Sequence, residues 1–255
     1  MHFLDISATE VTDDGLRYLA PVPLVELSIG ADHVTDYGMR SIAAIKSLKK
    51  LDVSDVPITD AGMRQLGSMT QLITLNVSGT KITNQAMQYL SGMKVLRSLD
   101  VSDTDVSTNA LAPLAQLPKL ATLRVSAPRL TAKGIELIGQ ISSLSTLEIR
   151  DGEIKTDLLK ALASMRHLDK LDLSGTNVSD ADVLNLKNMN VDIVVLKDCP
   201  KVTKKGAQAL AQLMKKSTIK YTADWHEMKP EELLDAAIDR ATRGRDKSSA
   251  RQTRQ

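Results

Sequence analysis

Histidine and cysteine are the side chains that most often bind metals or act as nucleophiles, and the sequence has four histidines and one cysteine. The histidines are His2, His33, His167 and His226, and no two of them share a metal-ligand spacing. Cys199 would need a histidine base to act as a nucleophile, and none can be paired with it from the sequence. Phosphate-binding and serine-nucleophile motifs are missing too. The sequence therefore predicts a protein that is not an enzyme and that has no cofactor or metal.

Charged and polar residues recur at one position of a repeated apolar pattern, where they suit binding more than catalysis. They are Asp5, Asp52, Asn76, Asp100, Arg124, Glu148 and Asp172, with Arg150 in the neighbouring column. Because alternate residues of a strand face opposite ways, we expect these side chains to project from one face of a sheet. Two interpretations stay open: ordinary solvated charges, or a docking surface for a basic protein partner.

The apolar pattern that positions these residues has a period of 24 residues, read from leucines that begin each unit. They are Leu24, Leu48, Leu72, Leu96, Leu120, Leu144 and Leu168. A second apolar column follows three residues later: Leu27, Leu51, Leu75, Leu99, Leu123, Leu147 and Leu171. A third follows two residues after that, as in Ile29 and Val53. Alternation of this kind predicts a short strand with one face in a core.

The second half of each unit changes from strand spacing to helical spacing. Met63, Leu66 and Met69 lie three residues apart, as on one face of a helix. Threonines precede these segments at the N-cap position: Thr12, Thr35, Thr59, Thr83 and Thr131. Such units bury their apolar faces only by stacking. We therefore predict an α/β solenoid, a right-handed horseshoe arc with parallel strands on the concave face and helices on the convex face.

Composition limits the classes of partner and compartment. The net charge of +2 is close to balanced and gives no general affinity for nucleic acid or membranes. No apolar run is long enough to span a bilayer, so a membrane partner is not expected. A single cysteine rules out a disulfide framework. With no signal peptide apparent, we expect an intracellular, reducing compartment, the cytoplasm.

We predict three segments along the chain. Residues 1–216 form about nine repeats, residues 217–243 add a closing strand and a helix as a cap, and residues 244–255 form a disordered basic tail. The tail contains Arg245, Lys247, Arg251 and Arg254. At the other end, Phe3 and Leu4 belong to a strand with no unit before it. We expect another chain, another copy or a preceding segment to cover them.

Two stretches resemble a known family. Leu171-Asp172-Leu173-Ser174-Gly175-Thr176-Asn177-Val178-Ser179-Asp180 resembles the L-x-L-S-x-T-x-[IV]-[TS]-D pattern of leucine-rich repeat proteins. The segment from Leu196 to Gly206 is similar to the cysteine-containing, ribonuclease-inhibitor-like subclass found in F-box proteins and bacterial relatives. In that segment Cys199 occupies a turn position where other units have threonine, so we interpret it as a small buried residue. The resemblance implies protein binding through the concave face and loops.

Two functions remain open at this stage. The first is a non-catalytic interaction module that binds a protein on its concave face. The second is a structural subunit of a large assembly, held by its ends and by a basic tail that contacts RNA. Deleting residues 244–255 separates them, because the first function would lose little and the second would lose assembly.

Overall fold

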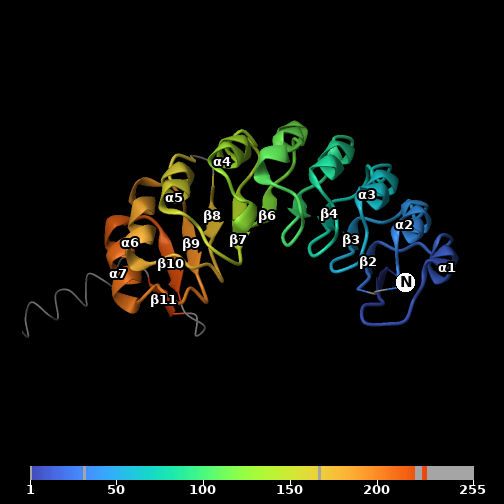
Figure 1. The fold of residues 1–255 in the computed structure, drawn as a ribbon, viewed down its shortest axis with the longest axis horizontal. Coiled ribbons are helices and arrows are strands. Elements are labelled where there is room, and N and C mark those ends of the chain that lie inside the picture. The colour runs from blue at the N-terminus through green and yellow to red at the C-terminus, as the bar shows by residue number, and fades with distance from the viewer. Residues whose placement is uncertain (1, 31–32, 166–167, 222–225, 229–255) are drawn as a thin grey trace, which may run out of the picture.

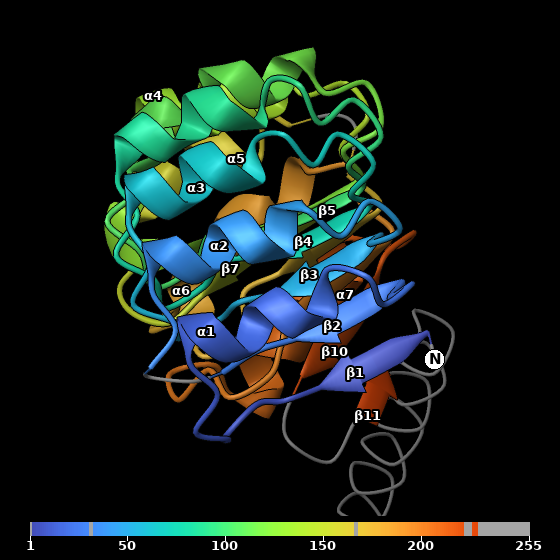
Figure 2. The same cartoon turned by 90° about the vertical axis from the view of Figure 1, so that its right-hand side faces the viewer.

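A computed structural model describes residues 2–30, 33–165, 168–221 and 226–228. The chain forms an arc in which strands line the inner side and helices the outer side (Figure 1). Seen along the arc, the helices form one layer and the strands a second layer beside it (Figure 2). This arrangement confirms the predicted α/β solenoid with strands on the concave face.

Eleven strands form one sheet in the described part of the chain, in sequence order. The first ten pair in parallel, and the last is antiparallel to the tenth. They are β1 (Phe3–Asp5), β2 (Glu26–Ser28), β3 (Lys50–Asp52), β4 (Thr74–Asn76), β5 (Ser98–Asp100), β6 (Thr122–Ser126), β7 (Thr146–Arg150), β8 (Lys170–Asp172), β9 (Ile193–Leu196), β10 (Thr218–Tyr221) and β11 (His226–Met228).

The outer layer mixes α-helices and tighter 3₁₀ segments, labelled η. The α-helices are α1 (Asp13–Leu16), α2 (Asp36–Ala43), α3 (Asp60–Leu66), α4 (Ala132–Gly139), α5 (Thr156–Leu162), α6 (Asp180–Val183) and α7 (Lys204–Leu213). The 3₁₀ segments are η1 (Arg17–Leu19), η2 (Asn84–Leu90), η3 (Thr108–Ala110), η4 (Ala112–Gln116), η5 (Ala127–Arg129) and η6 (Leu184–Asn188). A helix in every unit was expected, so η2, η3 and η4 correct that expectation for units four and five.

The core follows the predicted columns. Leu75 pairs with Leu51 on one side and with Leu99 on the other, and all three side chains are at most 1% exposed. The leading leucines and the third column are buried in the same layers, as Leu72 and Val77 show. One continuous apolar core therefore runs through the stack, with each unit covered by its neighbours.

A tight turn after the strand recurs in most units of the stack. The turn residue has a positive φ angle in the left-handed region, where glycine and aspartate are favoured over bulkier residues. The residues are Asp55, Gly79, Asp103, Asp151, Gly175 and Asp198, with φ between +52° and +73°. After this turn the chain leaves the concave face and leads to the helix of the same unit.

The helix starts are tied from unit to unit by a ladder of carboxylates. Thr35, Thr59, Thr83 and Thr131 accept hydrogen bonds at their own helix N-termini, as predicted, whereas Thr12 does not. The carboxylate of Asp36 accepts the backbone N–H of Thr59 at 2.7 Å, its hydroxyl at 2.7 Å and the N–H of Gly62 at 2.9 Å. Asp13, Asp60 and Asp180 bond the next unit's threonine in the same way.

This ladder gives a first prediction. Replacing Asp36 by Ala removes three acceptor contacts and leaves the N–H of the buried Gly62 without its partner, so we expect a loss of about 1–3 kcal/mol in the free energy of unfolding. Chemical denaturation measures it. Asp157→Ala is the matched control, because Asp157 also lies in a first helical turn but is exposed and bonds no neighbouring unit. Equal losses in the two variants would show that the ladder adds nothing.

At the C-terminal end, Ile219 and Tyr221 lie in β10, which pairs with β9, so the predicted closing strand is confirmed. β11 is an additional strand that sequence reasoning missed. The rest of the predicted cap, with Trp225, lies outside the described residues, as does the tail 244–255. The three segment boundaries therefore stay predictions.

Candidate functional site

The predicted polar residues come together in one row across the concave face. The parallel register places Asp52, Asn76 and Asp100 beside one another on β3, β4 and β5. Arg124 and Glu148 continue the row on β6 and β7. The full row also includes Asp5 on β1 and Asp172 on β8. Each strand from β1 to β8 thus contributes one polar side chain at the same register position, whereas β9 has Val195 there.

Carboxylates and the amide in this row also hold the strand ends. Oδ1 of Asp52 accepts the N–H of Ser54 at 2.9 Å, and Oδ1 of Asn76 accepts the N–H of Ser78 at 3.0 Å. The same contact, to the residue two positions further on, is made by Asp5, Asp100 and Asp172. An Asp or Asn side chain commonly ends a strand in this way. The sequence left open whether these residues are solvated charges or a docking surface, and holding the strand ends is a further, structural role.

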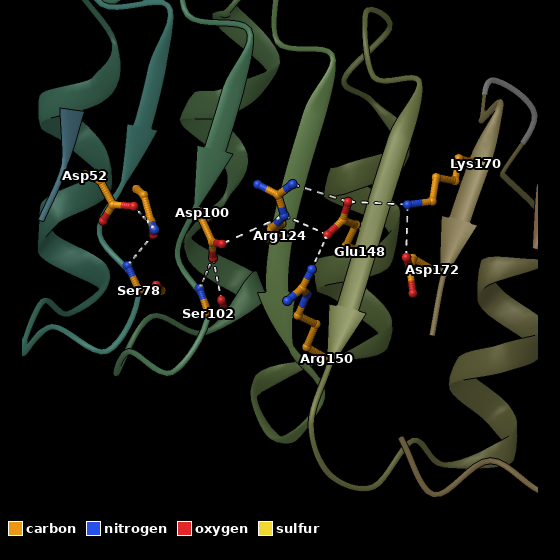
Figure 3. Close-up of polar contacts among 10 residues, drawn as sticks. Asp52, Ser78, Asp100, Ser102, Arg124, Glu148, Arg150, Lys170 and Asp172 are labelled. Atoms are coloured by element: carbon orange, nitrogen blue, oxygen red, sulfur yellow. Dashed lines mark hydrogen bonds and ion pairs between the residues drawn. The ribbon is translucent and has the colours of Figure 1, made fainter. Parts of the chain in front are cut away.

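The middle of the concave face is an ion network centred on Glu148 (Figure 3). Oε2 of Glu148 accepts Nε of Arg124 at 2.6 Å and Nη2 of Arg150 at 2.9 Å. Nζ of Lys170 lies 3.6 Å from the other carboxylate oxygen and 3.0 Å from Oδ2 of Asp172. Nε of Arg124 also lies 3.9 Å from Oδ2 of Asp100. Three acids and three cations therefore balance one another across β5, β6, β7 and β8.

Burial and charge act in opposite directions on Glu148. Burial alone would raise the pKa of this carboxyl, but the hydrogen bonds from Arg124 and Arg150 and the charge of Lys170 hold it below the ordinary value of 4.5. Glu148 and Asp172 are only 5% and 8% exposed, respectively, so the expectation of exposed charges at these two positions is wrong. The carboxylates of Glu148 and Asp172 are therefore buried, while the three cations of the network stay partly exposed on the concave face.

Lys170 is the member of this network that was not among the predicted site residues. It begins β8, two residues before Asp172, and faces the same side of the sheet. The signal that could have found it is the 24-residue column that it shares with Lys50 and Thr146.

Comparisons with known proteins identify the architecture. A leucine-rich repeat family model matches residues 44–67. Internalin C2 from Listeria monocytogenes aligns with a TM-score of 0.50 and 21% identity, over 83% of this chain and 84% of that chain. This chain has a leucine-rich repeat fold. A TLR13 structure in complex with ssRNA13 aligns with a TM-score of 0.54 and 17% identity, over 87% of this chain but 36% of that chain. No curated protein matches the sequence.

Cys199 is part of the internal structure of the solenoid. Its thiol donates to the carbonyl oxygen of Leu173 at 3.2 Å and lies 3.8 Å from the hydroxyl of Thr176. Burial raises the pKa of the thiol. The interpretation of Cys199 as a small buried turn residue is confirmed. Within the described residues, no group of three or more His, Cys, Asp or Glu side chains could hold a metal ion, and no helix could cross a membrane.

The other predicted contact residues belong to the two ends of the chain. The Phe3 side chain is 52% exposed on β1, and Leu4 is partly buried against the first core layer. The tail residues Arg245, Lys247, Arg251 and Arg254 lie outside the described residues.

Proposed function

We propose that this leucine-rich repeat protein is a non-catalytic interaction module that binds a basic protein partner on its concave face. The supporting observation is the difference between the two halves of the polar row. From β5 to β8 the charges of the network neutralise one another. Asp52 lies on β3, outside this network, and is partly exposed. Among the described residues its carboxylate pairs with no cation and instead accepts an amide hydrogen bond from Asn76 at 2.9 Å.

Small polar side chains surround Asp52 and leave it open to a partner. Thr74 and Ser98 occupy the adjacent column, and Ser54 and Ser78 the column on the other side, all partly exposed. The charged member of the first column, Lys50, pairs with Glu26 at 3.0 Å, so Asp5 and Asp52 leave this half of the concave face acidic. A partner with matching lysines or arginines would gain orientation and association rate from it.

We expect charge removal on this half to slow association without unfolding the protein. Asp5→Asn together with Asp52→Asn keeps the Oδ1 acceptor that ends each strand, since Asn76 already makes that contact naturally. The association rate with a purified partner, captured first by the wild-type chain, should fall and lose its dependence on salt. Surface-binding kinetics at low and high salt would measure this.

The matched control is Asp157→Asn with Asp192→Asn, which removes the same charge from exposed positions outside the polar row. This control should associate like the wild type. Equal binding by the concave variant and the wild type would refute the proposal. Loss of binding on deletion of residues 244–255 alone would favour the assembly subunit with a tail-mediated RNA contact, a ligand class named for the TLR13 complex.

Two finer points belong to the same proposal. The turn cysteine supports membership of the cysteine-containing, ribonuclease-inhibitor-like subclass. The free, buried thiol of Cys199 is compatible with a reducing intracellular compartment, which we propose as the site of action.

A further inference from the structure

The first repeat is acidic. Between residues 2 and 30 there is one arginine, Arg17, and five acids: Asp5, Glu10, Asp13, Asp14 and Glu26. The exposed Glu10 has no ion-pair partner among the described residues, and Asp14 pairs only with Arg17 in its own turn. These acids lie at the edge where β1 ends and α1 begins.

The last repeat has the opposite charge. Residues 191–221 contain two acids, Asp192 and Asp198, and seven lysines: Lys197, Lys201, Lys204, Lys205, Lys215, Lys216 and Lys220. Lys204 and Lys205 are exposed and have no carboxylate within ion-pair distance in the described part of the chain. They occupy the first turn of α7, where positive charge opposes the helix dipole.

Lys204 also breaks the ladder of carboxylates. It occupies the position at which Asp36, Asp60 and Asp180 accept hydrogen bonds from the next unit. A lysine ammonium cannot accept those bonds, but it can pair with a carboxylate. The last repeat is thus suited to contact an acidic surface rather than a further repeat of the same kind.

Both ends of the arc also expose apolar side chains. These lie at the edge where the strands begin, opposite the charged edge where the strands end and the helices begin. At the first repeat, Phe3 begins β1 and Val25 precedes β2, and they are 52% and 36% exposed. At the last repeat, Leu213 ends α7 and is 53% exposed. Because every unit runs from strand to helix and back, the end of α7 lies on the strand-start edge, as Phe3 does.

We propose that copies of this chain bind head to tail, with the last repeat of one copy seated on the first repeat of the next. In that arrangement Lys204 and Lys205 meet Glu10 and Asp14 on one edge, and the exposed side chains of Phe3, in the strand layer, and Leu213, in the helix layer, lie at the other edge. β11 pairs with β10 at this end, so β10 itself is not the edge strand, and we propose a contact made by side chains. The interface is heterologous, and it builds rings or filaments rather than a closed symmetric dimer.

Charge reversal on each end tests the proposal with the full chain. Analytical ultracentrifugation of the wild type should show association that grows with concentration and weakens with salt. Glu10→Lys with Asp14→Lys, and separately Lys204→Glu with Lys205→Glu, should each weaken self-association by at least about tenfold, because like charges then meet. Mixing the two variants should restore association, since each altered end again faces its opposite.

Lys119→Glu with Lys160→Glu is the control, because it reverses two exposed lysines in the middle of the arc. It should associate like the wild type, and circular dichroism should confirm that all variants are folded. Phe3→Ala should also weaken association, and this loss should depend little on salt because the substitution changes no charge. A wild type that stays monomeric at every concentration, or a mixture of the two end variants that does not associate, would overturn the proposal.

Discussion

Leu99→Ala should lower the free energy of unfolding by about 2–5 kcal/mol, the largest single-residue effect that we expect. Leu99 is fully buried on β5, between Leu75 and Leu123 of the adjacent strands. The substitution removes apolar contacts and leaves a cavity in the middle of the stack, where neighbouring layers on both sides limit collapse.

Chemical denaturation monitored by circular dichroism gives the measurement. Leu213→Ala makes the same chemical change at a position that is 53% exposed, and it should stay within about 0.5 kcal/mol of the wild type. If the two leucine variants lose similar stability, the assignment of Leu99 to the core column would be wrong.

The second large effect concerns the ion network. Glu148→Ala leaves Arg124, Arg150 and Lys170 with two acids in place of three, inside a partly enclosed surface. We expect a loss of about 2–4 kcal/mol, somewhat less than for a fully buried pair because the three cations are partly exposed. Glu26→Ala is the control, since its pair with Lys50 is exposed and should contribute less than about 1 kcal/mol.

The same carboxylate gives the network a dependence on pH. The pKa of Glu148 is lower in the folded chain than its ordinary value of 4.5, so the unfolded chain takes up the proton first. Its contribution to stability is therefore present above about pH 4.5 and lost as the pH falls through the folded pKa. Denaturation midpoints of the wild type should decrease in this acidic range more steeply than those of Glu148→Gln. Parallel curves would contradict the assigned role.

The sequence predicts the layers of this fold because side-chain type and spacing determine them directly. Leu75, Leu99 and Leu123 had to share a column, and they do. Whether the outer segment of a unit is α or 3₁₀ depends on small differences in packing, which is why η2 was not foreseen. Pro113 lies in the first turn of η4, where a proline is tolerated because the backbone N–H it lacks has no partner within the helix.

The candidate site was predictable as a row but not as a network. Alternation and period were enough to place Asp52, Asn76 and Asp100 on one face. The sequence could not tell that Arg124 and Arg150 both reach Glu148, since side-chain reach and burial decide those contacts. Nor did it show that Oδ1 of each Asp also holds the strand end.

The 3₁₀ segments of units four and five have a consequence for the shape of the arc. Strands on the concave side are about 4.8 Å apart, whereas packed α-helices need about 8–10 Å, and this mismatch bends the solenoid. The tighter 3₁₀ segments η2, η3 and η4 need less room on the convex side. The radius of curvature should therefore be larger around β4 and β5 than around β2 and β3. A partner that docks against Asn76 and Asp100 would meet a locally flatter platform, which accommodates a broad surface better than a single narrow helix.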